Sequence, residues 1–176
     1  MCGMPAPAGE SPGATPRRAV SGIIEEVHIL IAGIPATGKS TFSHWLVQHH
    51  EYVRCPTGVE PGPRFLAEIV HARAQDPNVV IDWGFPVAAL PTVTDLISDG
   101  VQPWWFDGDR DAALQCFLDR PGHPATRSDW DRQLAGIEER WEEIESLFRD
   151  RILHVISAGP HHVGPEELWA TISAQS

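Results

Sequence analysis

The fold expected for this chain is decided by the stretch Gly33-Ile34-Pro35-Ala36-Thr37-Gly38-Lys39-Ser40-Thr41. It matches the pattern GxxxxGK[ST], a glycine-rich loop whose backbone N–H groups surround phosphates while the lysine reaches them and the hydroxyl binds Mg²⁺. Lys39 is the only lysine among 13 basic residues, and all the others are arginine. An ammonium is a compact point charge that can follow a transferring phosphoryl group. We therefore expect Gly33 to Thr41 to bind nucleotide phosphates, with Lys39 as a catalytic residue.

The flanks of this loop have the required order of elements. Val27 to Ala32 is a short apolar run typical of a buried strand, and Ser40 to Val47 can form a helix. A helix start adds the positive end of its dipole to the phosphate site. Ser40 is the expected hydroxyl ligand of Mg²⁺. A chance glycine-rich turn is the alternative, and the strand and helix in register argue against it.

Length and composition predict one folded domain. The chain has 176 residues, which suits a single core. Residues 1–22 are rich in Pro, Gly, Ala and Ser and lack the apolar centre of a signal peptide, so we expect a flexible tail followed by one domain over residues 23–176. No apolar run approaches the roughly 20 residues of a membrane-spanning helix. We expect no membrane partner and a cytoplasmic protein.

Net charge and cysteine spacing argue against several classes of protein and of site. A net charge of −11 argues against a general nucleic-acid or anionic-membrane surface. Cys2, Cys55 and Cys116 are scattered without CxxC spacing, so neither a disulfide framework nor a zinc site is predicted. The histidine pairs His49-His50 and His161-His162, at a helix end and in a loop, also lack the spacing of a helical zinc pair.

Strand-like and helix-like segments alternate along the chain. After the first strand and helix, this alternation predicts an α/β fold with a five-stranded, mostly parallel sheet covered by helices on both faces. The further strands are expected at residues 51–55, 78–82, 103–107 and 151–156, and the further helices at 64–75, 87–98, 109–119, from Ser128 to Phe148, and after Pro165.

The segment after Ser128 has the strongest helical periodicity. Apolar residues recur every three or four positions from Trp130 to Phe148, and Ser128 and Asp131 stand in capping-box positions. Its glutamates between Glu138 and Glu145 are interpreted as a solvated face rather than as metal ligands.

With the loop and this order of elements, residues 24–174 resemble the P-loop kinase group, which includes nucleoside monophosphate, gluconate and shikimate kinases. The resemblance implies strand order 2-3-1-4-5 and a nucleotide base near the loop after the fifth strand, here Ser157 to Pro160. It also implies a mobile lid carrying arginines. No Asn-Lys-x-Asp guanine-specificity run occurs, so ATP is the expected nucleotide, with Mg²⁺.

Asp82 ends the third strand in Val79-Val80-Ile81-Asp82-Trp83-Gly84-Phe85-Pro86, which resembles the Asp-Gly-Phe-Pro-Arg run of nucleoside monophosphate kinases. Trp83 is inserted and Val87 stands in place of the arginine. A carboxylate at the end of a central strand could hold Mg²⁺ through water or accept a proton from an acceptor hydroxyl. We expect Asp82 to be catalytic and a metal ligand; a capping role in the next turn is the alternative.

The lid is expected near residues 120–128, where Arg120 and Arg127 flank Pro121 to Pro124. Arginine can bind phosphate through two N–H groups or stack on adenine. We expect Arg127 to be catalytic and Arg120 to bind the nucleotide, with Arg110 as a further candidate. Exposed arginines paired with Asp119 or Asp129 are the alternative.

The acceptor site is expected in the loop after the second strand. Arg64 could bind an anionic acceptor and Glu60 a hydroxyl, and either Glu60 or Asp82 could activate it. Surface charges beside a turn are the alternative.

Together these features predict an ATP-dependent phosphotransferase acting on a small molecule. A nucleotide-binding switch or weak ATPase without an acceptor is the alternative. A nucleic-acid end kinase is disfavoured because the chain lacks a basic groove.

Overall fold

The protein is described here by a computed structural model that covers residues 27–55, 63–84, 87–122, 126–159 and 161–175. The predicted tail, residues 1–22, lies outside these ranges. None of the helices in the covered ranges is both long and apolar enough to cross a membrane. The elements are β1 (Val27–Gly33), α1 (Lys39–His49), β2 (Val53–Cys55), α2 (Pro63–Gln75), β3 (Asn78–Asp82), η1 (Val87–Ala89), α3 (Leu90–Ser98), β4 (Gln102–Gly108), α4 (Arg110–Leu118), α5 (Arg127–Glu139), α6 (Trp141–Phe148), η2 (Arg149–Arg151), β5 (Ile152–Ser157), β6 (His161–His162) and α7 (Pro165–Ser173).

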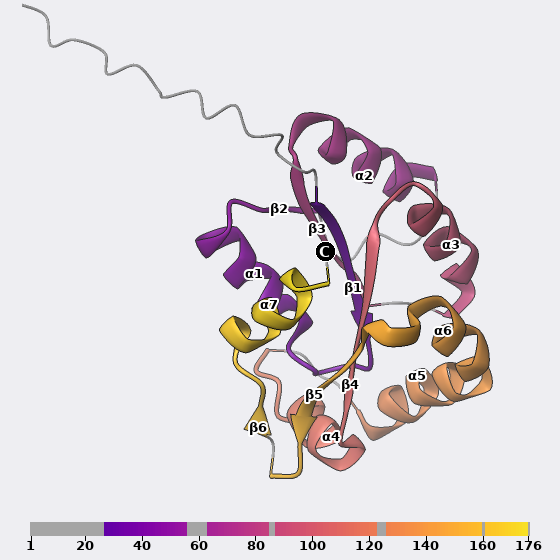
Figure 1. Cartoon of the computed structure of the whole chain (residues 1–176). Helices are drawn as coiled ribbons and strands as arrows, with labels where there is room; N and C mark the ends of the chain where they lie inside the picture. The colour runs from indigo at the N-terminus through magenta and orange to yellow at the C-terminus, as the bar shows by residue number, and fades with distance from the viewer. Residues whose placement is uncertain (1–26, 56–62, 85–86, 123–125, 160, 176) are drawn as a thin grey trace, which may run out of the picture.

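The described strands form one sheet in the order β2-β3-β1-β4-β5-β6 (Figure 1). The pairs from β2 to β5 are parallel, which confirms the expected order 2-3-1-4-5. The expected loop at His161 and His162 is wrong, because these residues pair antiparallel with Ser157 and Ile156 as strand β6. A strand of two residues is too short for any periodicity to reveal it.

Each face of the sheet is covered by its own helices (Figure 1). Ile29 and Ile31 pack in one core with residues of α1 and α7. Leu30 and Ala32 pack in the other core with residues of α2, α3, α5 and α6. Successive side chains of a strand point to opposite faces, so a strand buried on both sides reads as a continuous apolar run.

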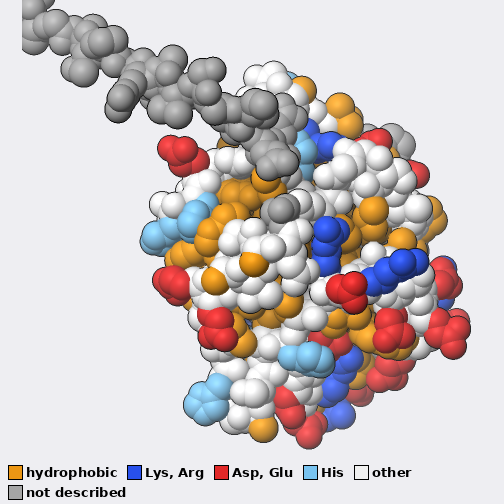
Figure 2. Space-filling view, in the orientation of Figure 1, with side chains coloured by type: hydrophobic (Ala, Val, Ile, Leu, Met, Phe, Trp, Pro, Cys, Tyr) orange, Lys and Arg blue, Asp and Glu red, His pale blue; other side chains and the backbone are white. Residues whose placement is uncertain are grey.

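The long helix expected from Ser128 is two helices. α5 and α6 meet at Arg140, whose backbone leaves the helical region at φ −112° and ψ 19°. The break gives α6 its own N-terminus, and the positive end of the helix dipole there stabilises the carboxylates of Glu142 and Glu143. Acidic side chains gather on the surface of this region (Figure 2), and the glutamates from 138 to 145 are exposed, as expected of a solvated face.

The capping box also differs from the expected one. Thr126 is the N-cap of α5, its hydroxyl accepts from the backbone N–H of Asp129, and Asp129 accepts from the backbone N–H of Thr126. Ser128 and Asp131 therefore lie inside the first turns of α5. The predicted capping box was two residues too late, because Ser128 and Asp131 have the same spacing and the same chemistry as Thr126 and Asp129.

Candidate phosphate-binding site

The loop from Gly33 to Thr41 joins β1 to α1 and packs closely against β4. Gly33 has φ 138°, and a Cβ atom there would lie 2.1 Å from the backbone oxygen of Phe106. Only glycine fits this contact. Gly38 has φ 82° and is the N-cap of α1; no side chain from the described residues caps this turn, and its first turn has no acidic residue. The N–H groups at the start of α1 are thus available to an anion.

Lys39 extends into the loop and is 8% exposed. Its Nζ donates to the backbone oxygens of Gly33 (3.1 Å) and Ile34 (2.6 Å) and lies 3.4 Å from Thr37 Oγ1. Burial lowers the pKa of Lys39 from 10.5 to about 8; the charge of Asp82 opposes this effect and that of Arg120 adds to it. The ammonium therefore lies among neutral oxygens within electrostatic reach of both Asp82 and Arg120.

The hydroxyl groups of the loop differ in exposure. Thr37 is buried, and its Oγ1 donates to the backbone oxygen of Ile34 (2.9 Å), which fixes the turn. Ser40 and Thr41 are exposed in the first turn of α1. The Ser40 hydroxyl is thus accessible, as a ligand of Mg²⁺ must be.

Asp82 lies at the carboxyl end of β3, beside β1, and is 4% exposed. Its Oδ2 accepts from Nη2 of Arg54 at 2.5 Å. The same guanidinium approaches α1, with Nη1 3.1 Å from Nε2 of His44. Arginine has no acceptor, so His44 accepts this hydrogen bond through a deprotonated Nε2. Sequence reasoning missed Arg54, because the parallel register that pairs it with Val80, and so directs it to the face of Asp82, is not visible in a short run of sequence.

Trp83 does not disturb this end of β3. It is 4% exposed and its ring packs against that of Phe65 on α2, with centroids 4.8 Å apart. The residue that departs from the Asp-Gly-Phe-Pro run is thus a core residue on the opposite face of the sheet from the Ile29 core.

A second buried aspartate is the last residue but one of β4, the other neighbour of β1. Asp107 is 5% exposed, and its Oδ1 accepts from the backbone N–H of Gly108 (2.7 Å) and from Nη1 of Arg110 (2.5 Å). Sequence reasoning placed Asp107 at a strand end without a role. The two strands beside β1 therefore each carry a buried aspartate near their carboxyl end, and these aspartates pair with Arg54 of β2 and Arg110 of α4.

The two expected lid arginines have different surroundings. Arg120 follows α4, is exposed, and lies close enough to Lys39 to affect its pKa. Arg127 is the first residue of α5; its side chain is 67% exposed and its Nε donates to Asp131 Oδ1 at 2.9 Å. Residues 123–125 of the expected lid, Glu60, and the side chain of Arg64 lie outside the described part of the structure.

β6 brings a histidine to the phosphate loop. A Cβ atom on Gly38 would lie 3.4 Å from Nδ1 of His162. The other ring nitrogen of His162 is 3.7 Å from Sγ of Cys116 on α4. The strand that sequence reasoning missed thus covers one side of the loop.

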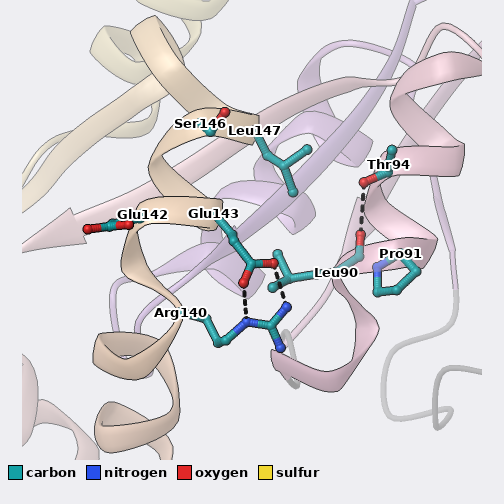
Figure 3. A pocket seen from close by; sticks show the side chains of 8 residues that line it. All are labelled: Leu90, Pro91, Thr94, Arg140, Glu142, Glu143, Ser146 and Leu147. Carbon is teal, nitrogen blue, oxygen red and sulfur yellow. Dashed lines mark hydrogen bonds and ion pairs between the residues drawn. The ribbon is translucent and has the colours of Figure 1, made fainter.

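A separate groove of about 430 Å³ lies between α3 and α6 (Figure 3). Leu90 and Leu147 point into it, and the ion pair of Arg140 and Glu143 spans its lower side in Figure 3. Its lining contains no residue of the phosphate loop. In the described residues, no three His, Cys, Asp or Glu side chains gather as a metal-binding group.

No protein-family model matches the sequence, and the sequence has no significant match among curated proteins. Solved structures do match. A tunicamycin resistance protein from Deinococcus radiodurans is 17% identical, over 85% of this chain and 95% of that one, with a TM-score of 0.56. A shikimate kinase from Bacteroides thetaiotaomicron is 13% identical, over 84% and 98%, with a TM-score of 0.53. A gluconokinase from Sinorhizobium meliloti 1021 is 14% identical, over 86% and 98%, with a TM-score of 0.50. These similarities confirm the P-loop kinase fold expected from the sequence.

Proposed function

We propose that this protein is an ATP- and Mg²⁺-dependent phosphotransferase that acts on a small-molecule acceptor. The observation that carries the proposal is the position of Lys39, buried in a glycine loop between β1 and α1 with a buried aspartate at the end of each neighbouring strand. Phosphoryl transfer requires positioning and charge stabilisation more than covalent chemistry, and this arrangement offers both. The fold shared with a gluconokinase and a shikimate kinase supports the same reaction class.

The residues of the loop divide the binding of ATP between them. Backbone N–H groups from Ala36 to Thr41 would surround the phosphates, because that of Ile34 donates to the backbone oxygen of Phe106 and Pro35 has none, and Lys39 would pair with the β- and γ-phosphate oxygens. Mg²⁺ would be held by the Ser40 hydroxyl and, directly or through water, by Asp82; both donors are oxygen, which this ion prefers. When bound, Mg²⁺ would neutralise charge that develops between the β- and γ-phosphates.

In the reaction, the hydroxyl oxygen of the acceptor forms a bond to the γ-phosphorus while the bond from the bridging oxygen to the γ-phosphorus breaks, and ADP leaves. The hydroxyl proton passes to a carboxylate. Asp82 is the candidate within the described residues, as the alternative to its role in holding Mg²⁺, because Arg54 contacts its Oδ2 and leaves Oδ1 as an acceptor. Arg120, near Lys39, would contribute positive charge or stack on the base.

The test begins with nucleotide binding. ATP with Mg²⁺ should raise the melting temperature by mass action, by an amount equivalent to ~2.7 kcal/mol at a hundredfold excess over Kd. Lys39→Ala should largely lose this shift and keep the fold, whereas Arg132→Ala, which removes an exposed charge on α5, should keep the shift. Equal stabilisation of wild type and Lys39→Ala would contradict the proposal.

Turnover is the second step. ATP consumption is measured against small hydroxyl compounds, nucleosides and nucleotides, with Asp82→Asn as the variant expected to bind ATP and lose turnover. Binding of ATP without stimulation by any acceptor would instead favour a nucleotide-dependent switch.

We also propose that residues 120–128 form a lid. If they close over the phosphates, Arg127→Ala should lower turnover more than ATP affinity, and Arg120→Ala, if it stacks on the base, should mainly lower affinity. Hydrogen exchange over this segment should slow with a nonhydrolysable ATP analogue. Exchange that is slow and unchanged by the analogue would show that the segment is fixed.

A further inference from the structure

The carboxylate of Asp82 already has positively charged groups beside it. Its side chain is 3% exposed, and a carboxylate so deeply buried requires a compensating positive group. Arg54 supplies that group by direct contact at 2.5 Å, and the ammonium of Lys39 acts on Asp82 electrostatically. The carboxylate expected to hold Mg²⁺ is thus already paired with a guanidinium.

We propose that Arg54 and Mg²⁺ compete for Asp82, so that Arg54 sets the magnesium dependence of nucleotide binding. The inference rests on the proposed nucleotide and Mg²⁺ site. A guanidinium and a divalent cation that share one carboxylate repel each other, and each lowers the affinity of the site for the other. Removal of the Arg54 charge should therefore strengthen the effect of Mg²⁺ on ATP binding.

The surroundings of Arg54 allow it to give up Asp82 without losing every contact. Its side chain is 23% exposed, so water reaches part of the guanidinium. Its Nη1 donates to His44 on α1, and this contact does not involve Asp82. Arg54 comes from β2, a strand of three residues that pairs with β3 alone among the described strands. Arg54 is a positioning residue in this proposal: it acts on Mg²⁺ through Asp82.

The structure contains a matched control for this proposal. Arg110 contacts Asp107 at the same distance, 2.5 Å, and Asp107 is buried to a similar extent at the end of β4. This pair lies on the other neighbour of β1 and has no proposed role in holding Mg²⁺. Arg110→Gln therefore removes a guanidinium from the other buried aspartate and leaves Asp82 with its partner.

The experiment measures the affinity of ATP by calorimetry at pH 7, once with EDTA and once with saturating MgCl₂. The dissociation constant with EDTA, divided by the dissociation constant with MgCl₂, reports how strongly Mg²⁺ favours ATP binding. Arg54→Gln should raise this ratio about fivefold or more, since fivefold is the effect of one charge at about 4 Å in the dielectric of bulk water, the weakest case. Arg54→Lys, which keeps the charge, and Arg110→Gln should both leave this ratio near the wild-type value, because a contact of Arg110 with the nucleotide would change both dissociation constants alike.

The Asp82→Asn background tests whether the effect passes through the carboxylate. There, Arg54→Gln should change the ratio by less than half as much as in wild type. This double variant also covers the case in which Arg54→Gln alone unfolds, because Asp82→Asn removes the buried carboxylate that would otherwise lack its guanidinium. The ratio measured for the double variant is compared with the ratios of Asp82→Asn and of wild type.

Two results would overturn the inference: the same ratio for wild type and Arg54→Gln, or an equally large effect of Arg54→Gln in the Asp82→Asn background. A purely structural Arg54 would lower the melting temperature of Arg54→Gln and leave the ratio unchanged. Failure of wild type to bind ATP under either condition would instead reject the proposed function, so the two failures are distinguishable.

Discussion

The buried ammonium of Lys39 should make stability depend on pH in a defined direction. Its pKa is lowered from 10.5 in the unfolded chain to about 8 in the folded protein. Between these pH values the unfolded chain binds more protons than the folded protein does, so the free energy of unfolding rises with pH. Lys39→Met removes the charge and keeps an unbranched side chain of similar length, and this variant should lack the rise.

The magnitude follows from the same two pKa values. At about 1.4 kcal/mol for each tenfold change in acid dissociation, the buried charge costs the folded protein about 3 kcal/mol at pH 7. About 2 kcal/mol of this is recovered between pH 7 and pH 9.5, and the rest at higher pH. Tyr52 and Cys55 act in the opposite direction, because burial raises their pKa values to about 12 and about 11. Both groups are present in the variant, so the difference between the two proteins isolates Lys39.

The assay is urea unfolding at pH 7 and pH 9.5, followed by tryptophan fluorescence, since Trp104 and Trp105 are fully buried. The change in unfolding free energy between the two pH values should be about 2 kcal/mol more positive for wild type than for Lys39→Met. Equal changes would show that the ammonium is hydrated and has an ordinary pKa, and the close contacts with the loop oxygens would not exist in solution.

Two further predictions concern backbone and thiol contacts of the site. Gly33→Ala should lower the melting temperature far more than Gly100→Ala, because a Cβ at Gly33 meets the backbone of β4 at 2.1 Å whereas Gly100 has open space and only a positive φ; similar melting temperatures for the two variants would refute the close contact of β1 with β4. In a Cys2→Ser chain, a thiol reagent should modify Cys116, which is partly exposed, and leave Cys55 unmodified until the protein unfolds, because Cys55 is 1% exposed and its pKa is about 11. Mass spectrometry of the modified peptides identifies the thiol, and native modification of Cys55 would contradict its burial.

The sequence predicted the fold well where buried strands are long enough to recognise. β3 was predicted from Asn78 to Asp82, as found, because a strand covered on both faces is an unbroken apolar run. The division of the last long helix was not predicted. Trp141, Ile144 and Phe148 continue the spacing of α5 because both helices pack on the same core, so periodicity does not detect one non-helical residue at Arg140.

The candidate site was predictable where its chemistry is local in sequence. The loop from Gly33 to Thr41 and the strand-ending Asp82 are both visible in short runs. Arg54 was not, because its contact with Asp82 spans 28 residues and depends on how β2 pairs with β3. The role of Arg127 stays a prediction; the structure places its guanidinium on Asp131, an i,i+4 pair that the sequence alone does not distinguish from a phosphate contact.

The partners of the basic groups explain why a lone lysine sits in the loop of a chain whose other basic residues are arginine. Arg54 and Arg110 each contact a buried carboxylate, which holds a guanidinium by charge as well as by hydrogen bonds. Lys39 instead donates to two neutral backbone oxygens and approaches one hydroxyl. A phosphate can replace these neutral partners at less cost than it could replace a carboxylate partner. Each of these two arginines is thus held at a carboxylate, and under the proposed function the lysine is the cation that moves to an incoming anion. A buried cation with weak partners lowers the stability of the folded protein, and under the proposed function the same feature would leave its charge available to the phosphates.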